Sequence, residues 1–195
     1  FPVLSNVAAR YVASLGVTKD GDNLVSQWDD QSGNGRHLTE STNKPLWVAS
    51  GINGKAIIRY DGSNDTLSDT FALAQPFHVW IVAVANTFTS EDSLICGVLG
   101  DPDFMIIKQR ITSPQIVHVA GVSFGHAVSP TLGADFLIGS FFSGASSYQS
   151  LNNDAPVSGT NIGTTGIAVL QVGGLVGGTQ TIDGDIAEVV IFSAE

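Results

Sequence analysis

The sequence predicts an all-β protein, an antiparallel two-sheet sandwich formed by one domain over residues 1–195. Its length is typical of a single domain with a buried core of its own. It contains 22 glycines and many Val, Ile, Thr and Phe residues, a composition that favours short strands joined by tight turns. Ten or more apolar or alternating segments are separated by Gly, Pro, Asn and Asp, with almost no helical periodicity, which indicates two stacked sheets.

Charge and composition exclude several classes of protein. The formal net charge is −10, from 8 basic and 18 acidic residues, so nucleic acid is not an expected partner. Apolar residues make up 43% of the chain, too many for a disordered protein, yet no apolar segment is long enough to predict insertion into a membrane. The single cysteine, Cys96, excludes an internal disulfide and is expected to be buried. Because the chain opens at Phe1, we expect it to be a mature or excised part of a longer protein.

The order of apolar segments predicts where the strands lie. The longest run, 77–85, is predicted to be a central strand buried on both faces, and Trp28 and Trp80 are expected in the core. Residues 18–23 and 51–54 are predicted to be turns, and residues 152–166 to be partly loop. The expected strands or extended segments begin near residue 9 and then cover 24–28, 36–40, 45–48, 56–60, 77–85, 94–99, 104–108, 116–120, 136–142, 147–151, 168–172 and 186–192.

Three segments of the sequence together resemble the laminin G-like jelly roll of the concanavalin A-like lectin/glucanase superfamily. The typical motifs of that group are W-x-D-x-S-G-N-G, F-D-G and G-x-I-x-E-v-x-I-[FY]. Tyr60 stands where the family usually has Phe, and the segments span residues 28–192. The matching positions are Trp28, Asp30, Ser32, Gly33, Asn34 and Gly35, then Tyr60, Asp61 and Gly62, and finally Gly184, Ile186, Glu188, Ile191 and Phe192.

The resemblance implies two curved antiparallel sheets whose first and last strands meet at one edge. It also implies sugar binding, adhesion or assembly, in a secreted bacterial protein or on a phage virion surface. Three functions remain open, since a fold does not determine function. The first is a non-catalytic lectin-like module that binds a glycan or surface polysaccharide, and the second is a structural capsid or tail domain that contacts a neighbouring virion protein. The third is a glycoside hydrolase.

The hydrolase alternative depends on the motif Asp183-x-Asp185-x-x-Glu188. Laminarinase-like glycosidases of this fold carry E-x-D-x-x-E on a strand, where two carboxyl groups must face one cleft. Plain alternation puts Asp183 and Asp185 on one face and Glu188 on the other, so only a bulge brings all three together. The first position is Asp, shorter by one methylene than the family's Glu, and we therefore expect no catalysis.

Two acidic turns are candidate calcium loops, because calcium binds carboxylate and amide oxygens in irregular segments. Asp and Asn in turns also cap the backbone, an alternative that involves no metal. A sugar site, in turn, pairs an aromatic ring with polar side chains, and Trp47 and Tyr148 are the aromatic residues closest to polar loops. The candidate calcium ligands are Asp29, Asp30 and Asn34 in the first turn and Asp61, Asn64 and Asp65 in the second.

Overall fold

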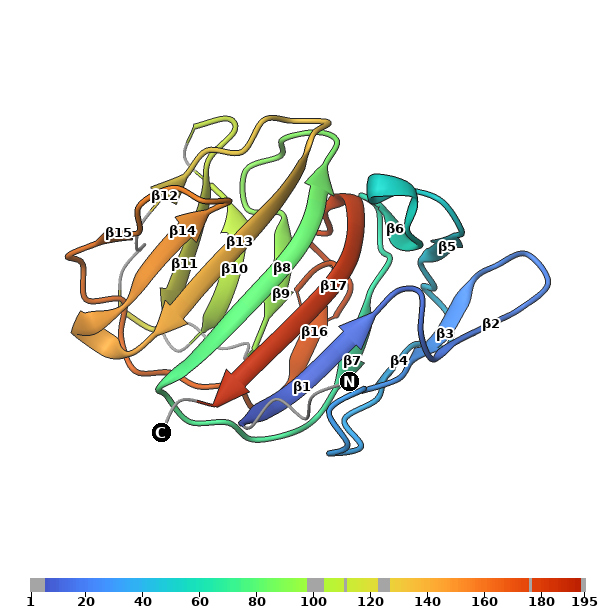
Figure 1. Ribbon diagram of the computed structural model, residues 1–195, viewed down its shortest axis with the longest axis horizontal. Coiled ribbons are helices and arrows are strands. Elements are labelled where there is room, and N and C mark those ends of the chain that lie inside the picture. Colours follow the sequence, from blue (N-terminus) through green and yellow to red (C-terminus); the bar gives the residue numbers. More distant parts are fainter. Residues whose placement is uncertain (1–5, 98–103, 111, 123–126, 176, 194–195) are drawn as a thin grey trace.

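The protein is a sandwich of two antiparallel sheets (Figure 1). The computed structural model describes residues 6–97, 104–110, 112–122, 127–175 and 177–193. The first sheet, sheet A, faces the reader in Figure 1, and β1 (Val7–Val12) pairs with β17 beside its main path. That path runs β15 (Val157–Ser158), β14 (Tyr148–Leu151), β13 (Asp135–Phe142), β8 (Phe77–Ala85), β17 (Asp183–Ser193), β6 (Ile57–Asp61) and β5 (Leu46–Val48).

The second sheet, sheet B, lies behind sheet A in Figure 1. Two short 3-10 turns, η1 (Ile52–Gly54) and η2 (Gly144–Ser146), connect strands of sheet A. The strands of sheet B run in the order β12 (Ala127–Val128), β11 (Ile116–Ala120), β10 (Met105–Gln109), β9 (Ser93–Cys96), β16 (Leu170–Val172), β7 (Leu67–Asp69), β4 (Leu38–Thr39), β3 (Val25–Trp28) and β2 (Val17–Lys19).

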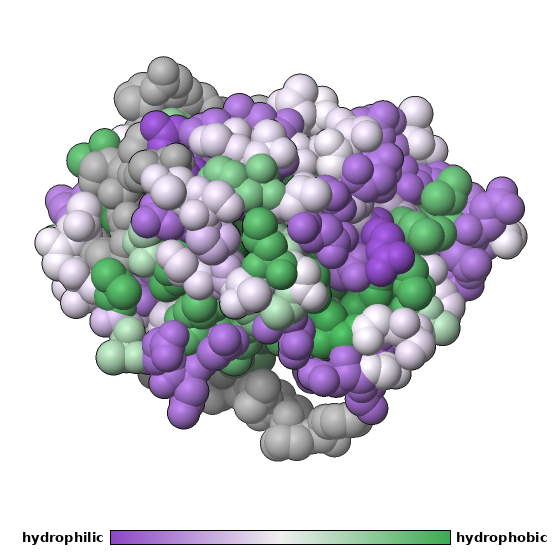
Figure 2. All heavy atoms as spheres, turned by 90° about the horizontal axis from the view of Figure 1, so that it is seen from above, coloured by the Kyte–Doolittle hydropathy of each residue, from purple (hydrophilic) through white to green (hydrophobic). Residues whose placement is uncertain are grey.

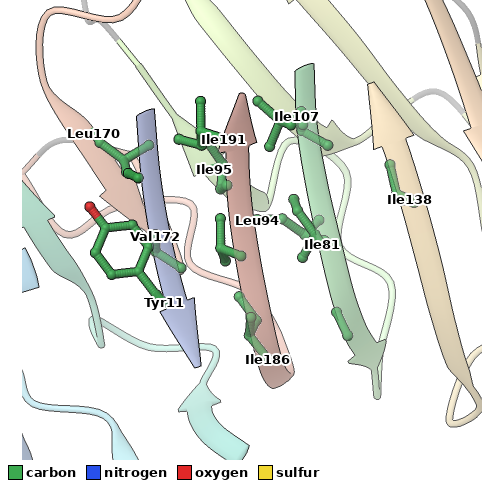
Figure 3. Packing of buried hydrophobic residues seen from close by; sticks show 14 of the residues in the cluster. Tyr11, Ile81, Leu94, Ile95, Ile107, Ile138, Leu170, Val172, Ile186 and Ile191 are labelled. Carbon is green, nitrogen blue, oxygen red and sulfur yellow. The ribbon is translucent and has the colours of Figure 1, made fainter. Parts of the chain in front are cut away.

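The core fills the space between the sheets, and its side chains come from alternate strand positions. Branched aliphatic residues dominate, with Ile81 and Ile191 of sheet A opposite Leu94 and Ile107 of sheet B in the close view of Figure 3. Trp28 is fully buried, as expected, and its ring centroid lies 5.8 Å from that of Tyr11. Period-two burial therefore explains the main apolar pattern of the sequence.

The predicted fold class is confirmed, and most expected segments contain a strand. The expected strand 94–99 ends at Cys96, which is buried, and residues 98 and 99 lie outside the described residues. The first and last strands pair, and the Ser193 backbone N–H donates to the Asn6 carbonyl oxygen at 2.9 Å. Four short strands are not expected from the sequence, namely β2, β7, β12 and β15, and of these β2 ends inside the segment 18–23, which is predicted to be a turn. Strands of two or three residues carry too little periodicity to be recognised.

The prediction that 77–85 is buried on both faces is wrong. Burial along β8 alternates strictly, so Phe77, Val79 and Ile81 point into the core while Trp80 and Val82 lie half-buried on the outer face of sheet A. Trp80 is therefore not a core residue. Every described residue of β9, β10 and β11 is buried instead, so both faces of sheet B are covered there. An uninterrupted apolar run cannot distinguish these two situations, because a half-exposed face can also be apolar.

The surface of the molecule that is seen from above in Figure 2 is mainly polar. Figure 2 shows hydrophilic and neutral residues over most of this view, with hydrophobic residues in small patches between them. Within the described part of the chain, no helix has the length and apolar character needed to cross a membrane.

Candidate functional site

An aromatic patch lies on the outer face of sheet A, where β14, β13 and β8 run side by side (Figure 1). We define the outer aromatic patch as His78, Trp80, Phe141 and Tyr148. His78 stacks on Phe141 with ring centroids 4.3 Å apart, and Phe141 lies 5.1 Å from Tyr148. Cross-strand pairing aligns Tyr148 with Phe141 and Phe141 with His78, so the three rings form a row across the strands. Burial lowers the pKa of His78, which favours the neutral ring in this stack.

Trp80 lies beside this row because the facing strand carries a glycine. Gly139 is opposite Trp80, and a Cβ atom built on Gly139 falls 2.5 Å from Cζ3 of the indole and 2.9 Å from Oγ of Ser150. Any larger residue at position 139 must displace the indole. The glycine thus lets the tryptophan lie across β13 towards β14.

A bulge in β17 changes the face of the residues that follow it. Asp185 pairs with Val84 and Glu188 pairs with Val82, with a register shift between Ile186 and Glu188. Because paired residues share a face, Asp185 and Glu188 both point to the outer face, as does Asp183, two residues before Asp185. The sequence pattern named this bulge as the condition for bringing the three carboxylates to one face, and the structure meets it.

A pocket of about 340 Å³ opens at the bulge, and we call it the bulge pocket. It forms where β17 exchanges its neighbour, since β6 pairs with residues up to Ile186 and β1 pairs from Glu188 onward. Its volume is in the range of small-ligand sites. The lining residues come from β1, the η1 segment, β8 and β17: Val12, Ser14, Ile52, Asn53, Lys55, Ala56, Val82, Ala187 and Glu188.

Two of the three motif carboxylates are paired with arginines. Nε of Arg10 donates to Oε1 of Glu188 at 2.8 Å, and both side chains are about one-third exposed. Arg59 binds Asp185 through two bonds of 2.7 and 2.9 Å, and this pairing raises the pKa of Arg59. Both oxygens of Asp185 are therefore engaged, whereas only Oε1 of Glu188, a lining residue of the bulge pocket, accepts a hydrogen bond from the described residues.

The two aromatic residues predicted to bind sugar lie far apart in sheet A. Trp47 is on β5, the strand at the opposite edge from Tyr148, so the structure does not bring them together. The Trp47 indole N–H donates to the Ala13 carbonyl oxygen at 2.8 Å, its ring packs against the core, and the Lys19 ammonium lies 4.4 Å from the ring centroid. Tyr148 belongs to the outer aromatic patch.

The first candidate calcium turn is a clamp on β1. The buried Asp30 carboxylate accepts hydrogen bonds from the backbone N–H groups of Arg10, Ser32 and Arg36 at 2.9, 2.8 and 3.1 Å, and from Oγ of Ser32 at 2.7 Å. The Asn34 amide donates to the Val7 and Ala8 carbonyl oxygens, both at 3.0 Å. Asp29, which is half-buried, accepts from the Gln27 side chain at 2.6 Å. Both oxygens of Asp30 are therefore engaged by the protein, as in the backbone-capping alternative.

The second candidate turn brings two carboxylates together. The Asp65 carboxylate accepts from the Asp61 backbone N–H at 3.1 Å, and the Asp61 carboxylate accepts from the Ser63 N–H at 2.8 Å. Burial, together with the nearby Asp61 charge, raises the pKa of Asp65 to about 6. Asn64 lies between them and is exposed. Among the described residues, no three or more His, Cys, Asp and Glu side chains are grouped to hold a metal ion, and calcium binding stays a prediction.

Sequence reasoning missed most of this face. The row formed by His78, Phe141 and Tyr148 comes from three strands, and their sequence distance hides the contact. The strict pairing of 77–85 with 135–142 could have revealed it, because it places alternate residues of both runs on one surface. The pocket has no local sequence signal other than the disturbed alternation at Ala187.

Comparison with known proteins gives a structural likeness only. No family model matches the sequence, and no curated protein does either. Domain 4 of AbnA, a GH43 extracellular arabinanase from Geobacillus stearothermophilus solved in complex with arabinotriose, superposes with a TM-score of 0.73 at 13% identity, covering 97% of this chain and 93% of that one.

Two further similar structures are longer enzymes. A Trypanosoma rangeli sialidase in complex with sialic acid gives a TM-score of 0.66 at 12% identity, and a GH54 α-L-arabinofuranosidase soaked with a cyclic sulfate inhibitor gives 0.66 at 13%. The alignments cover 97% and 88% of this chain, but only 31% and 47% of those chains. The chain therefore spans about a third of the sialidase's length. At these identities the likeness establishes the β-sandwich fold.

Proposed function

We propose that this protein is a non-catalytic carbohydrate-binding module whose binding surface is the outer face of sheet A. The observation that carries the proposal is the outer aromatic patch, which lies on the same face as the bulge pocket and shares β8 with it. Aromatic faces stack on the C–H faces of sugar rings, and polar side chains at the pocket satisfy hydroxyl groups. The ligand is a glycan chain that runs across the patch and ends in the pocket.

Three further observations support this proposal. The arabinanase domain of similar fold was solved in complex with arabinotriose, and it is a separate domain of an enzyme. The three sequence segments resemble laminin G-like domains, and we assign the chain to that group as part of the proposal. The module then acts outside the cell, on a secreted protein or on a virion surface.

Paired tryptophan variants test the proposed surface. We expect the wild-type protein to bind glycans on an array, and calorimetry with the best one to show about a tenfold weaker affinity for Trp80→Leu, because the stacking contact is lost. Trp47→Leu is the matched control, since Trp47 lies at the other edge of the sheet. Binding that depends on Trp47 and not on Trp80 would move the site to β5. If no glycan binds, the proposal fails and the face is a contact surface for a neighbouring protein.

The bulge at Ala187 favours glycoside hydrolysis as a second candidate function, because it brings Asp183, Asp185 and Glu188 to one face. Retaining glycosidases need two free carboxyl groups about 5 Å apart on either side of the scissile bond. The arginine pairs at Asp185 and Glu188 oppose this role. Release of reducing sugar that disappears in Glu188→Gln would establish hydrolysis, and no release from a polysaccharide that binds the protein excludes it for that ligand.

A further inference from the structure

The bulge pocket carries one positive charge without a countercharge. The charged lining residues are Lys55 and Glu188. Glu188 is paired with Arg10, which is not part of the lining, whereas no carboxylate of the described chain lies within ion-pair distance of the exposed Lys55. Asp135 contacts the same segment through Asn53 instead, since its carboxylate accepts from the Asn53 amide at 3.3 Å.

Lys55 differs in this respect from the other basic residues. Four of them pair with acidic side chains elsewhere in the protein, and Arg10 pairs with Glu188. The remaining two, Lys19 and Arg36, lie over the rings of Trp47 and Phe71. In a chain with a net charge of −10, few side chains are positively charged, and the Lys55 ammonium at the pocket remains available to bind a ligand.

The neighbouring polar groups suit a small, singly charged oxygen anion. Lys55 offers three donors as a compact charge, the Ser14 hydroxyl offers a fourth, and the Asn53 side chain lies beside them in the lining. Apolar walls from Val12, Ile52 and Val82 can receive the C–H face of the same sugar ring. The pocket therefore combines an anion contact with a surface for a sugar.

We infer that the bulge pocket binds the carboxylate of an acidic sugar, such as a uronic acid residue, and that Lys55 selects it. This inference rests on the proposed function, and it adds the ligand's chemical class to it. The aromatic patch holds neighbouring sugars of either kind, whereas Lys55 distinguishes a carboxylate from the corresponding alcohol. Since the pair is exposed to solvent, the gain is modest and depends on salt.

Two oligosaccharides that differ only in the acidic group test this inference. Calorimetry compares trigalacturonic acid with the same trisaccharide after reduction of its carboxyl groups to alcohols, at 50 and 300 mM salt. We expect the wild type to bind the acid about fivefold tighter at low salt, and less so at high salt. We expect Lys55→Gln to lose this preference and keep its affinity for the reduced sugar. Lys44→Gln is the control and should retain the preference, because Lys44 pairs with Asp20 outside the pocket.

The outcomes separate the two claims. Equal wild-type affinity for both sugars, with binding that still depends on Trp80, overturns the carboxylate inference and leaves carbohydrate binding intact. A preference that persists in Lys55→Gln also overturns it. Binding of neither sugar, nor of any other glycan, removes both claims. Tighter binding of a sulfated trisaccharide than of the carboxylated one assigns the pocket to sulfate esters and contradicts the inference as stated.

Discussion

Replacement of Asp30 by Asn tests whether the first acidic turn is a clamp or a calcium site. The exchange keeps the shape of the side chain and removes its charge. One oxygen still accepts from the backbone N–H groups of Arg10 and Ser32, but the new amide nitrogen faces the backbone N–H of Arg36. Two donors then point at each other, and the Arg36 N–H loses its partner.

The expected loss follows from these bonds. An unsatisfied N–H costs about 1–3 kcal/mol when buried, and about 1–2 kcal/mol is expected for the part-buried Arg36 N–H. The two remaining bonds each weaken by about 0.5–1 kcal/mol when the acceptor becomes neutral. The Ser32 hydroxyl can turn to accept from the amide, so this contact is kept. We therefore expect the free energy of unfolding to fall by about 3 kcal/mol, or roughly 6–12 °C in Tm for a chain of this size.

Urea unfolding, followed by tryptophan fluorescence and circular dichroism, measures the change with EDTA and with calcium. Asp29→Asn is the matched control in the same turn. It should cost less than about 1 kcal/mol, because among the described residues the Asp29 carboxylate contacts only the side chains of Gln27 and His37. A loss below about 1 kcal/mol for Asp30→Asn would refute the clamp. So would a wild-type protein that loses stability in EDTA while Asp30→Asn does not, since the carboxylate would then act through calcium.

Two further predictions concern single residues. The raised pKa of Asp65 means that the native state holds its proton more tightly than the unfolded chain, so this group's contribution to stability falls as pH rises from about 4 to about 6. Asp65→Asn should therefore stabilise the protein by about 1 kcal/mol at pH 7.5, after allowance for solvent screening, and by much less at pH 4; thermal melts at both pH values measure this, and an equal gain at both contradicts it. Gly173→Ala should cost more than about 3 kcal/mol in urea unfolding, because φ is +93° and the new Cβ meets the buried Tyr60 ring. Gly177→Ala has a similar φ and open space, so it should cost only about 1 kcal/mol, and equal losses would disprove the steric reason.

The fold could be predicted from the sequence because it depends on local signals. Alternation, turn residues and the long run of 77–85 place most strands, and burial of alternate residues defines the space between the sheets. The strand pairing could not be predicted in this way, because it depends on contacts between distant segments. Thus β17 is central in sheet A even though it ends the described chain, and its two neighbours on one side, β1 and β6, come from separate segments.

The candidate site was harder to predict for the same reason. Trp80 was expected in the core because its strand is apolar throughout, and only the cross-strand glycine at 139 shows how the ring lies on the surface. Whether the three carboxylates of the motif at 183–188 share one face depends on a bulge, and alternation alone cannot show where a bulge lies. For Asp30, the sequence offers calcium binding and backbone capping as alternatives, and it cannot decide between them because the N–H groups that the carboxylate accepts from include one on distant β1.

Chemical-shift mapping on the isotopically labelled protein, titrated with the glycan that binds best on the array, tests the location of the site most directly. We predict that the largest shifts fall on the Trp80 indole N–H and on the outer-face residues of β8, β13 and β14, and continue to Glu188 and Lys55. Shifts confined to Trp47, to the turns at 29–35 and 61–65, or to sheet B would contradict the assignment of the binding surface to the outer face of sheet A.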